Sequence, residues 1–148
     1  MARSGPVFAA KEERNLKRLL IASALILPFV AACAASSTSA PADPSYAKNV
    51  EPVIAKRCLG CHSAEKHKAG LVLDKASGYK DLTTRMSVQV TDMPLVKPGD
   101  PDGSYLWLKL MHTAPKGKGM PRTLFGSKKL PADELELIKS WIETGAKP

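Results

Sequence analysis

Hydrophobic residues recur at helical spacing near the end of this chain. Four apolar residues fall on one face of that segment: Leu135, Ile138, Trp141 and Ile142. Asp133 and Glu134 occupy the place of a first helical turn, where acidic side chains are favoured, and Gly145 is placed as a C-terminal stop. The pattern predicts a closing helix with Trp141 in the core.

Two earlier segments show weaker helical patterns. The first runs from about residue 46 to 58, with Pro52 tolerated because it falls near the helix start. The second covers Tyr105–Met111, follows a run of turn residues and includes Trp107 as a further core residue. No alternation of apolar and polar residues predicts a sheet, and Gly70–Leu73 suits only an extended loop. We therefore expect an all-α fold.

Five consecutive residues carry the strongest chemical signal in the sequence, Cys58-Leu59-Gly60-Cys61-His62. Two thiols three positions apart can form thioether bonds to the two vinyl groups of a haem. The adjacent His62 then lies beneath the iron as an axial ligand. The spacing predicts one covalently bound haem c.

Two other chemistries use the same cysteine spacing. A closed zinc site wants four ligands, usually as two spaced pairs, and only His67 and His112 remain to join His62 and the two thiols. A thioredoxin-like redox motif expects a strand-helix-strand context that the pattern does not show. A zinc-stabilised surface interaction module stays open as an alternative to the haem site.

The third cysteine, Cys33, ends a segment with the layout of a secretory signal peptide. Basic residues between Lys11 and Arg18 precede an uncharged, mostly apolar run, Leu19–Val30. The end of this segment, Val30-Ala31-Ala32-Cys33, resembles the lipobox of bacterial lipoproteins, in which cleavage leaves the cysteine as a lipid-modified N-terminus. We therefore expect a signal peptide over residues 1–32 and lipidation of Cys33.

Two other outcomes are compatible with this N-terminus. Ordinary cleavage could follow the Ala32-Cys33-Ala34 pattern, or the uncharged run up to Ala35 could stay as a membrane anchor. That run is at the short limit for a helix that spans a bilayer, and Pro28 interrupts it. All three outcomes place the rest of the chain on the periplasmic or cell-surface side of a bacterial membrane.

The rest of the chain divides into a tether and one small domain. Residues 33–44 lack large apolar side chains and predict a lipidated N-terminus followed by a flexible tether. Residues 45–148 predict a single domain, in which a buried haem would replace apolar side chains that a chain with 5% aromatic residues lacks. With Cys33 lipidated and Cys58 and Cys61 bonded to haem, no thiol is left for a disulfide.

From about Tyr46 to Ala146 the chain resembles the class I c-type cytochromes, and more closely the planctomycete-type cytochrome c domain. The resemblance is carried by the Cys58–His62 motif and Met120-Pro121, with support from Val50–Ile54, Gly70–Asp74, Pro98–Pro101, Ser104–Leu106 and Leu135–Ala146. It implies a small all-helical domain that encloses one covalent haem. In such domains a His lies on one face of the iron and a Met on the other, here His62 and Met120.

Two methionines followed by proline compete for the second face of the iron. Met120 lies in a polar, glycine-containing loop that offers an apolar side chain no core face, and it precedes the closing helix as in the family. Met93 is the rival, while Met86, Met111 and His112 suit packing or surface roles. We therefore expect Met120 to be the sixth ligand.

The chain is basic, and its basic residues gather near the proposed site. The formal charge of +8 becomes +5 without the 5 basic and 2 acidic residues of 1–32. Basic residues flank the haem motif (Lys56, Arg57, Lys66, Lys68) and the Met120 loop (Lys116, Lys118, Arg122, Lys128, Lys129). Such a basic rim would steer an acidic redox partner by long-range attraction. The alternative is that these residues form only a solvated basic surface without a partner. Haem and export together argue against nucleic acid as a partner.

These features predict a membrane-tethered monohaem electron carrier outside the cytoplasm, without catalytic residues of its own. Its iron would cycle between Fe(II) and Fe(III) with both axial positions filled. If no methionine reaches the iron, the sequence instead predicts a five-coordinate haem c module. Such a module would sense a gas or serve as the haem subunit of a redox enzyme complex.

Overall fold

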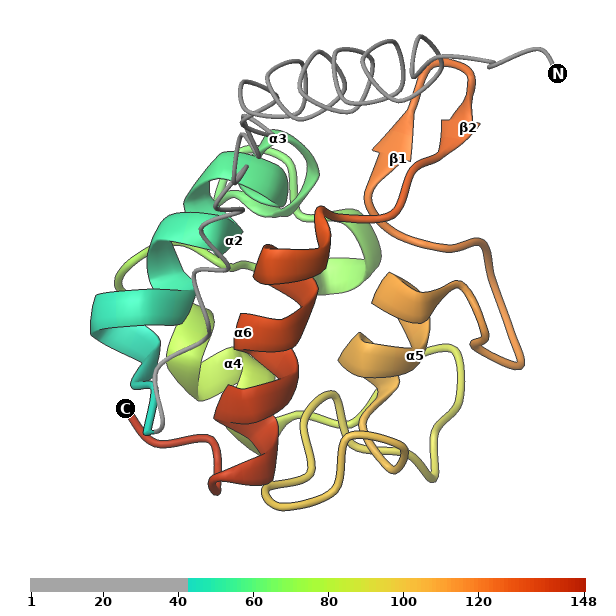
Figure 1. Ribbon diagram of the computed structural model, residues 1–148. Coiled ribbons are helices and arrows are strands. Elements are labelled where there is room, and N and C mark those ends of the chain that lie inside the picture. Colours follow the sequence, from blue (N-terminus) through green and yellow to red (C-terminus); the bar gives the residue numbers. More distant parts are fainter. Residues whose placement is uncertain (1–42) are drawn as a thin grey trace, which may run out of the picture. The chain divides into compact units, whose positions relative to one another are not determined.

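The computed structural model describes residues 43–148, which are mainly helical (Figure 1). In chain order the helices are η1 (Tyr46–Val50, a π-helix), α2 (Glu51–Arg57), α3 (Leu59–His62), η2 (Lys68–Gly70, a 3-10 helix), α4 (Gly78–Thr84), α5 (Tyr105–Met111) and α6 (Ala132–Glu143). Between α5 and α6 lies an antiparallel hairpin of β1 (Arg122–Thr123) and β2 (Gly126–Ser127). The expected helix-rich domain is confirmed, apart from this hairpin.

Each of the three predicted helices is present. The first consists of η1, α2 and α3 in succession, and Pro52 lies in the first turn of α2 as expected. α5 covers Tyr105–Met111, and α6 is followed by Gly145 at a φ of 100°. Glycine adopts this left-handed backbone conformation readily because it has no Cβ. The C-terminal stop that the sequence predicts is therefore where the helix ends.

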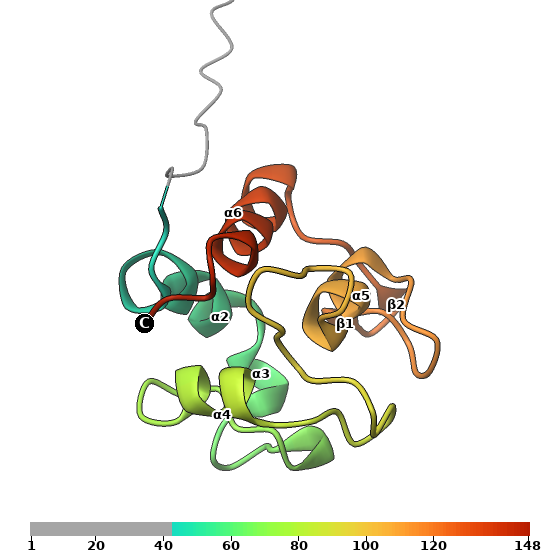
Figure 2. The same ribbon diagram turned by 90° about the horizontal axis from the view of Figure 1, so that it is seen from below.

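α6 is the central element of the domain. It packs against η1 and α5, and Figures 1 and 2 show it between α2 and α5. Trp141 on α6 is fully buried, with its ring centroid 5.6 Å from that of Tyr46. The indole Nε1 donates a hydrogen bond to the Lys147 carbonyl at 2.8 Å, which satisfies the polar atom of this side chain. The predicted core positions of Trp107 and Trp141 are confirmed.

The two ends of the described part of the chain lie side by side. The Tyr46 N–H donates to the Lys147 carbonyl at 2.9 Å, and Lys147 Nζ pairs with Asp43 at 2.8 Å. Pro44 is fully buried. The packed part of the chain therefore includes Asp43 and Pro44, two residues that the sequence pattern assigns to the tether.

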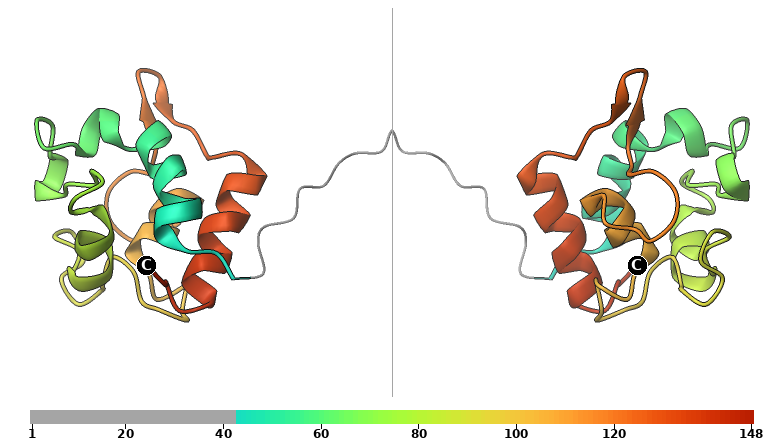
Figure 3. Two further views of the ribbon diagram at one scale, coloured as in Figure 1. Left: turned by 90° about the vertical axis from the view of Figure 1, so that its left-hand side faces the viewer. Right: turned by 90° about the vertical axis from the view of Figure 1, so that its right-hand side faces the viewer.

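Two elements contradict the expectation of loops. α4 contains weak helix formers, with Gly78 at its start and threonines at its end, and it forms where Leu82 is fully buried in the core. The strands of the hairpin have two residues each, too few to show alternation. The hairpin turn holds Leu124 and Phe125 in place of the usual turn-forming residues, and it projects from one end of the domain (Figure 3).

Gly78 at the start of α4 lies against the buried ring of Tyr46. A Cβ at this position would lie 2.5 Å from Tyr46 Oη and 2.9 Å from the Leu73 carbonyl oxygen. Tyr46 Oη is itself buried and has no hydrogen-bond partner. The close approach of α4 to the core thus depends on the absence of a side chain at residue 78.

Gly78→Ala should lower the free energy of unfolding by about 1–3 kcal/mol, because the added methyl group overpacks the core. Tyr46→Phe should cost nothing or stabilise the domain, because it removes a buried hydroxyl without a partner. In the Tyr46→Phe background the cost of Gly78→Ala should shrink, which urea unfolding of the four proteins will show. An equal cost in both backgrounds would mean that the two residues do not meet.

Tyr46 should also make stability depend on alkaline pH. Burial, with a smaller contribution from Glu51, raises its pKa from 10.0 to about 12. A folded-state pKa above the unfolded value contributes stability that is fully present below pH 10 and is lost as pH rises through about 12. The thermal unfolding temperature of the wild type should therefore fall more steeply over this pH range than that of Tyr46→Phe. Parallel pH profiles would contradict the assignment.

Candidate functional site

The Cys-x-x-Cys-His motif lies where α2 gives way to α3. Cys58 ends α2 and precedes α3, and its carbonyl accepts hydrogen bonds from the N–H groups of Cys61 and His62, both at 3.0 Å. This single turn directs all three side chains to one cavity, which Cys58, Cys61 and His62 line together. The structure thus brings together the three residues that the motif predicts as the haem attachment site.

The walls of the cavity are mostly apolar. They are formed by a set of leucines from several segments of the chain: Leu71, Leu73, Leu82, Leu95, Leu106 and Leu110. The cavity measures about 260 Å³ and is open to solvent, just below the range of about 300–1,000 Å³ for ligand sites. A planar group larger than the enclosed space would be held by apolar contacts and keep one edge at the surface.

His62 has the properties of a metal ligand. Its Nδ1 is buried and has no hydrogen-bond partner. Burial lowers the pKa of His62 below its ordinary value, and the nearby carbonyls of Leu71 and Lys68 oppose this shift without forming a well-aligned hydrogen bond. The imidazole is therefore neutral at physiological pH, which is the form that binds metal ions.

Cys58 carries a mostly buried thiol that favours its protonated form. Burial and the charge of Glu134 raise the pKa of Cys58 to about 12, against a smaller opposing effect of Arg57. Thiol-disulfide exchange and zinc binding both use the thiolate, which a lowered pKa favours. Within residues 43–148, no three His, Cys, Asp or Glu side chains come together as a metal-ligand set. The zinc alternative gains no support from the described residues.

Met120 lies on the wall of the same cavity. Its N–H donates to the Lys109 carbonyl at 2.8 Å, and its carbonyl accepts a hydrogen bond from His112 Nε2 at 3.1 Å. The preceding carbonyl of Gly119 accepts from Ser127 Oγ at 2.6 Å. The Met120 loop is thus held by the end of α5 on one side and by the hairpin on the other.

The other three methionines of residues 43–148 differ from one another in their relation to this cavity. Met93 does not line this cavity and instead borders a separate shallow pocket, and Met111 packs against the core. Met86 does line the cavity, although 48% of its surface is exposed. Sequence reasoning assigned Met86 to packing or the surface, and the cavity makes it a second thioether close to the site.

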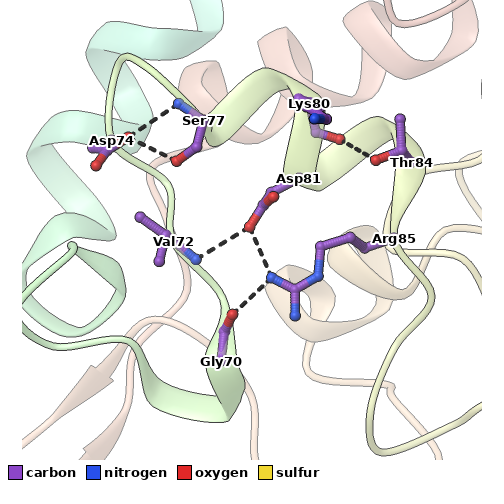
Figure 4. Close-up of polar contacts among 8 residues, drawn as sticks. All are labelled: Gly70, Val72, Asp74, Ser77, Lys80, Asp81, Thr84 and Arg85. Carbon is purple, nitrogen blue, oxygen red and sulfur yellow. Dashed lines mark hydrogen bonds and ion pairs between the residues drawn. The ribbon is translucent and has the colours of Figure 1, made fainter.

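Four basic side chains also line the cavity, and two of them are neutralised by carboxylates. Arg57 holds Glu134 of α6 by two hydrogen bonds of 2.7 Å. Arg85 donates to Asp81 and to the Gly70 carbonyl, both at 2.7 Å, and Asp81 also accepts from the Val72 N–H (Figure 4). These contacts tie the segment after the haem motif to α4 and leave no net charge on this wall.

The other two basic residues, Lys109 and Arg122, have no carboxylate within ion-pair distance among residues 43–148. Lys109 is only 6% exposed, and its Nζ contacts Gln89 Oε1 at 3.1 Å and the Lys116 carbonyl at 3.3 Å. Burial, and then the charge of Arg122, lowers the pKa of Lys109. A buried charge without a counter-ion is costly, so this wall favours an anionic group in the cavity.

The residues of this cavity fit a haem. They combine two thiols, a neutral imidazole, a thioether, apolar walls and two cations without partners, which match the vinyl groups, the iron, the ring and the acidic side chains of that cofactor. Sequence reasoning missed Lys109 and Tyr105, whose hydroxyl oxygen lies 2.7 Å from Gln89 Oε1 and 2.8 Å from the Lys116 carbonyl oxygen and can donate to either of them. In the sequence, Lys109 and Tyr105 resemble ordinary helix residues, because only the fold shows which face of α5 lines the cavity.

Comparison with known proteins agrees with this geometry. Residues 58–122 match the family model described as Planctomycete cytochrome C. This match supports a planctomycete-type cytochrome c domain over that segment. The cytochrome c family implies a covalently bound haem c and electron transfer through it, and both Cys58 and Cys61 lie within the matched segment. No curated protein and no solved structure matches the chain.

The predictions for the N-terminus lie outside the described residues. They comprise the signal peptide over 1–32, the lipidation of Cys33 and most of the tether over 33–44. Within residues 43–148, no helix is both long enough and apolar enough to cross a membrane.

The haem should be bound covalently, because both thiols line the cavity that would hold it. Protein denatured in acidified acetone should keep its pigment, and Cys58→Ala with Cys61→Ala should lose it. His62→Ala is the matched control, because it removes the imidazole expected to bind the iron and leaves both thiols in place. A wild-type chain that releases all of its colour would rule out the c-type attachment.

Proposed function

We propose that this protein is a monohaem electron carrier that works outside the cytoplasm and has no substrate chemistry of its own. The observation that carries the proposal is the single cavity that gathers Cys58, Cys61, His62 and Met120. Bound there, the haem would supply one-electron exchange between Fe(II) and Fe(III). This chain's own residues would attach the haem, bind its iron, bury its ring and dock the partner protein.

The axial ligands would be His62 and Met120. His62 presents a neutral imidazole because burial lowers its pKa. Met120 is held on the cavity wall by the backbone of Lys109 and the side chain of His112. Together these two side chains would leave no iron position for a small ligand such as oxygen, which suits a carrier rather than a gas sensor.

Lys109 and Arg122 would neutralise the two acidic side chains of the haem. Both line the cavity and neither has a carboxylate partner among the described residues, whereas Arg57 and Arg85 are already paired. Gln89 and the Lys116 carbonyl fix the Lys109 ammonium in place. An anion bound there would remove the cost of burying this charge.

The setting of the carrier is part of the proposal. A lipid on Cys33 would tether the domain to the periplasmic or cell-surface side of a bacterial membrane, and the segment after Cys33 would give it reach. The exposed lysines near the haem motif and the Met120 loop, including Lys56, Lys66, Lys116 and Lys118, would attract acidic redox proteins. Nucleic acid has no role in this account.

Replacement of the sixth ligand tests the proposal directly. Met120→Ala should abolish the weak long-wavelength absorption band of the ferric protein, lower the reduction potential and let carbon monoxide bind the reduced protein. Met93→Ala is the matched control, because Met93 does not line the cavity, and it should change none of these properties.

Two outcomes of this experiment would contradict the assignment. If Met86→Ala produces the changes expected of Met120→Ala, the ligand is the other thioether on the cavity wall. If the wild type already binds carbon monoxide as readily as Met120→Ala, the protein is a five-coordinate haem module and not an electron carrier.

A further inference from the structure

Two adjacent apolar side chains at the tip of the β1–β2 hairpin are almost wholly exposed. Leu124 is 98% and Phe125 is 100% accessible to solvent. Figures 1 and 3 show the hairpin projecting at one end of the described domain, and the two residues form its turn. Large apolar side chains held together in water usually mark a contact surface for another molecule.

The tip is held in position by its base. Arg122 pairs with Ser127 and Thr123 with Gly126 across the two strands. Ser127 Oγ donates to the Gly119 carbonyl at 2.6 Å, and the Lys128 N–H donates to the Pro121 carbonyl at 3.1 Å. These contacts fix the hairpin to the Met120 loop, so the fold presents Leu124 and Phe125 outwards.

The tip is surrounded by positive charge. Between residues 114 and 132 the sequence has no acidic residue. This stretch contains five exposed basic side chains: Lys116, Lys118, Arg122, Lys128 and Lys129. None of the five forms an ion pair within residues 43–148. We call Leu124 and Phe125 with these five residues the hairpin surface, an apolar tip inside a cationic collar.

An anionic lipid bilayer suits the hairpin surface better than a protein does. A specific protein interface buries about 800 Å² on each partner, and a narrow two-residue tip would need a matching pocket to reach that area. A bilayer accepts an apolar tip without a pocket, and its anionic headgroups attract nearby basic side chains. Both the shape and the charge of the hairpin surface therefore favour lipid.

We propose that the β1–β2 hairpin is a membrane-contact element that inserts Leu124 and Phe125 into the interface of a bilayer containing anionic phospholipid. This contact is separate from lipidation at Cys33 and does not require the haem. Because Arg122 belongs both to the collar and to the cavity wall, the contact would turn the cavity towards the membrane. Electron exchange would then be directed to partners at the bilayer surface.

Vesicle flotation of residues 37–148 tests this proposal without the N-terminal segment. Within this segment, residues 43–148 contain a hydrophobic core formed by side chains between Tyr46 and Ala146. The domain should bind vesicles that contain equal parts of phosphatidylcholine and phosphatidylglycerol, and bind phosphatidylcholine alone far less. Leu124→Ser with Phe125→Ser should weaken binding about 100-fold, because two apolar side chains leave the bilayer.

Charge variants distinguish the effect of the cationic collar on vesicle binding from the effect of the net charge of the domain. Lys128→Gln with Lys129→Gln should weaken binding about tenfold. Lys75→Gln with Lys80→Gln removes the same charge from exposed positions outside the hairpin surface and should leave binding unchanged. Phe125→Trp keeps an apolar ring at the tip and should bind like the wild type. Circular dichroism of each variant checks that the helices are intact.

Three results would overturn the proposal. The first is no binding of the wild type to the anionic vesicles. The second is equal binding of the wild type and the Leu124→Ser, Phe125→Ser variant, which would leave only a diffuse electrostatic attraction. The third is that replacing Leu124 and Phe125 leaves vesicle binding unchanged but abolishes binding to an acidic protein. None of these measurements depends on the haem spectrum, so their failure leaves the electron-carrier proposal intact.

Discussion

The packing of α6 against η1 and α5, together with its ion pair to α2, positions the residues on which the proposed function depends. Trp141 and Tyr46 form its buried centre, and the paired Arg57 and Glu134 link the end of α2 to the start of α6. Arg57 immediately precedes Cys58, so this ion pair also fixes the start of the haem motif. A bidentate arginine-carboxylate pair holds its partners in one relative orientation, which a lysine pair would not do.

The site is assembled from segments that are far apart in the sequence. Cys61 and His62 come from α3, Cys58 from the junction of α2 and α3, Lys109 from α5, and Met120 from the loop that precedes the hairpin. The side chains that touch a bound group are thus carried by elements whose mutual positions depend on α6. The charge of the cavity wall also depends on the fold. Near α4, Asp81 neutralises Arg85, and near α5 the wall stays positive because Lys109 has no carboxylate partner among the described residues.

The sequence predicted what depends on local pattern and missed what depends on tertiary contact. The helical spacing of Leu135, Ile138 and Trp141 was sufficient to predict α6, and the five-residue motif was sufficient to predict which side chains gather at the cavity. α4 was missed because its helix propensity is weak and the burial of Leu82 is what stabilises it. Lys109 was missed because a lysine in a helix is usually solvated, and only the fold brings it to the cavity wall. The hairpin was missed because an apolar turn carries no turn signal.

The proposed function requires that the His62 imidazole and the Met120 thioether both bind the haem iron. X-ray absorption at the iron K-edge of the purified, coloured protein reports directly on the atoms bound to the metal. The account predicts one sulfur atom in the first coordination shell of the wild type and none in Met120→Ala. A wild-type shell made only of nitrogen and oxygen, or a protein that binds zinc in place of iron, would contradict it.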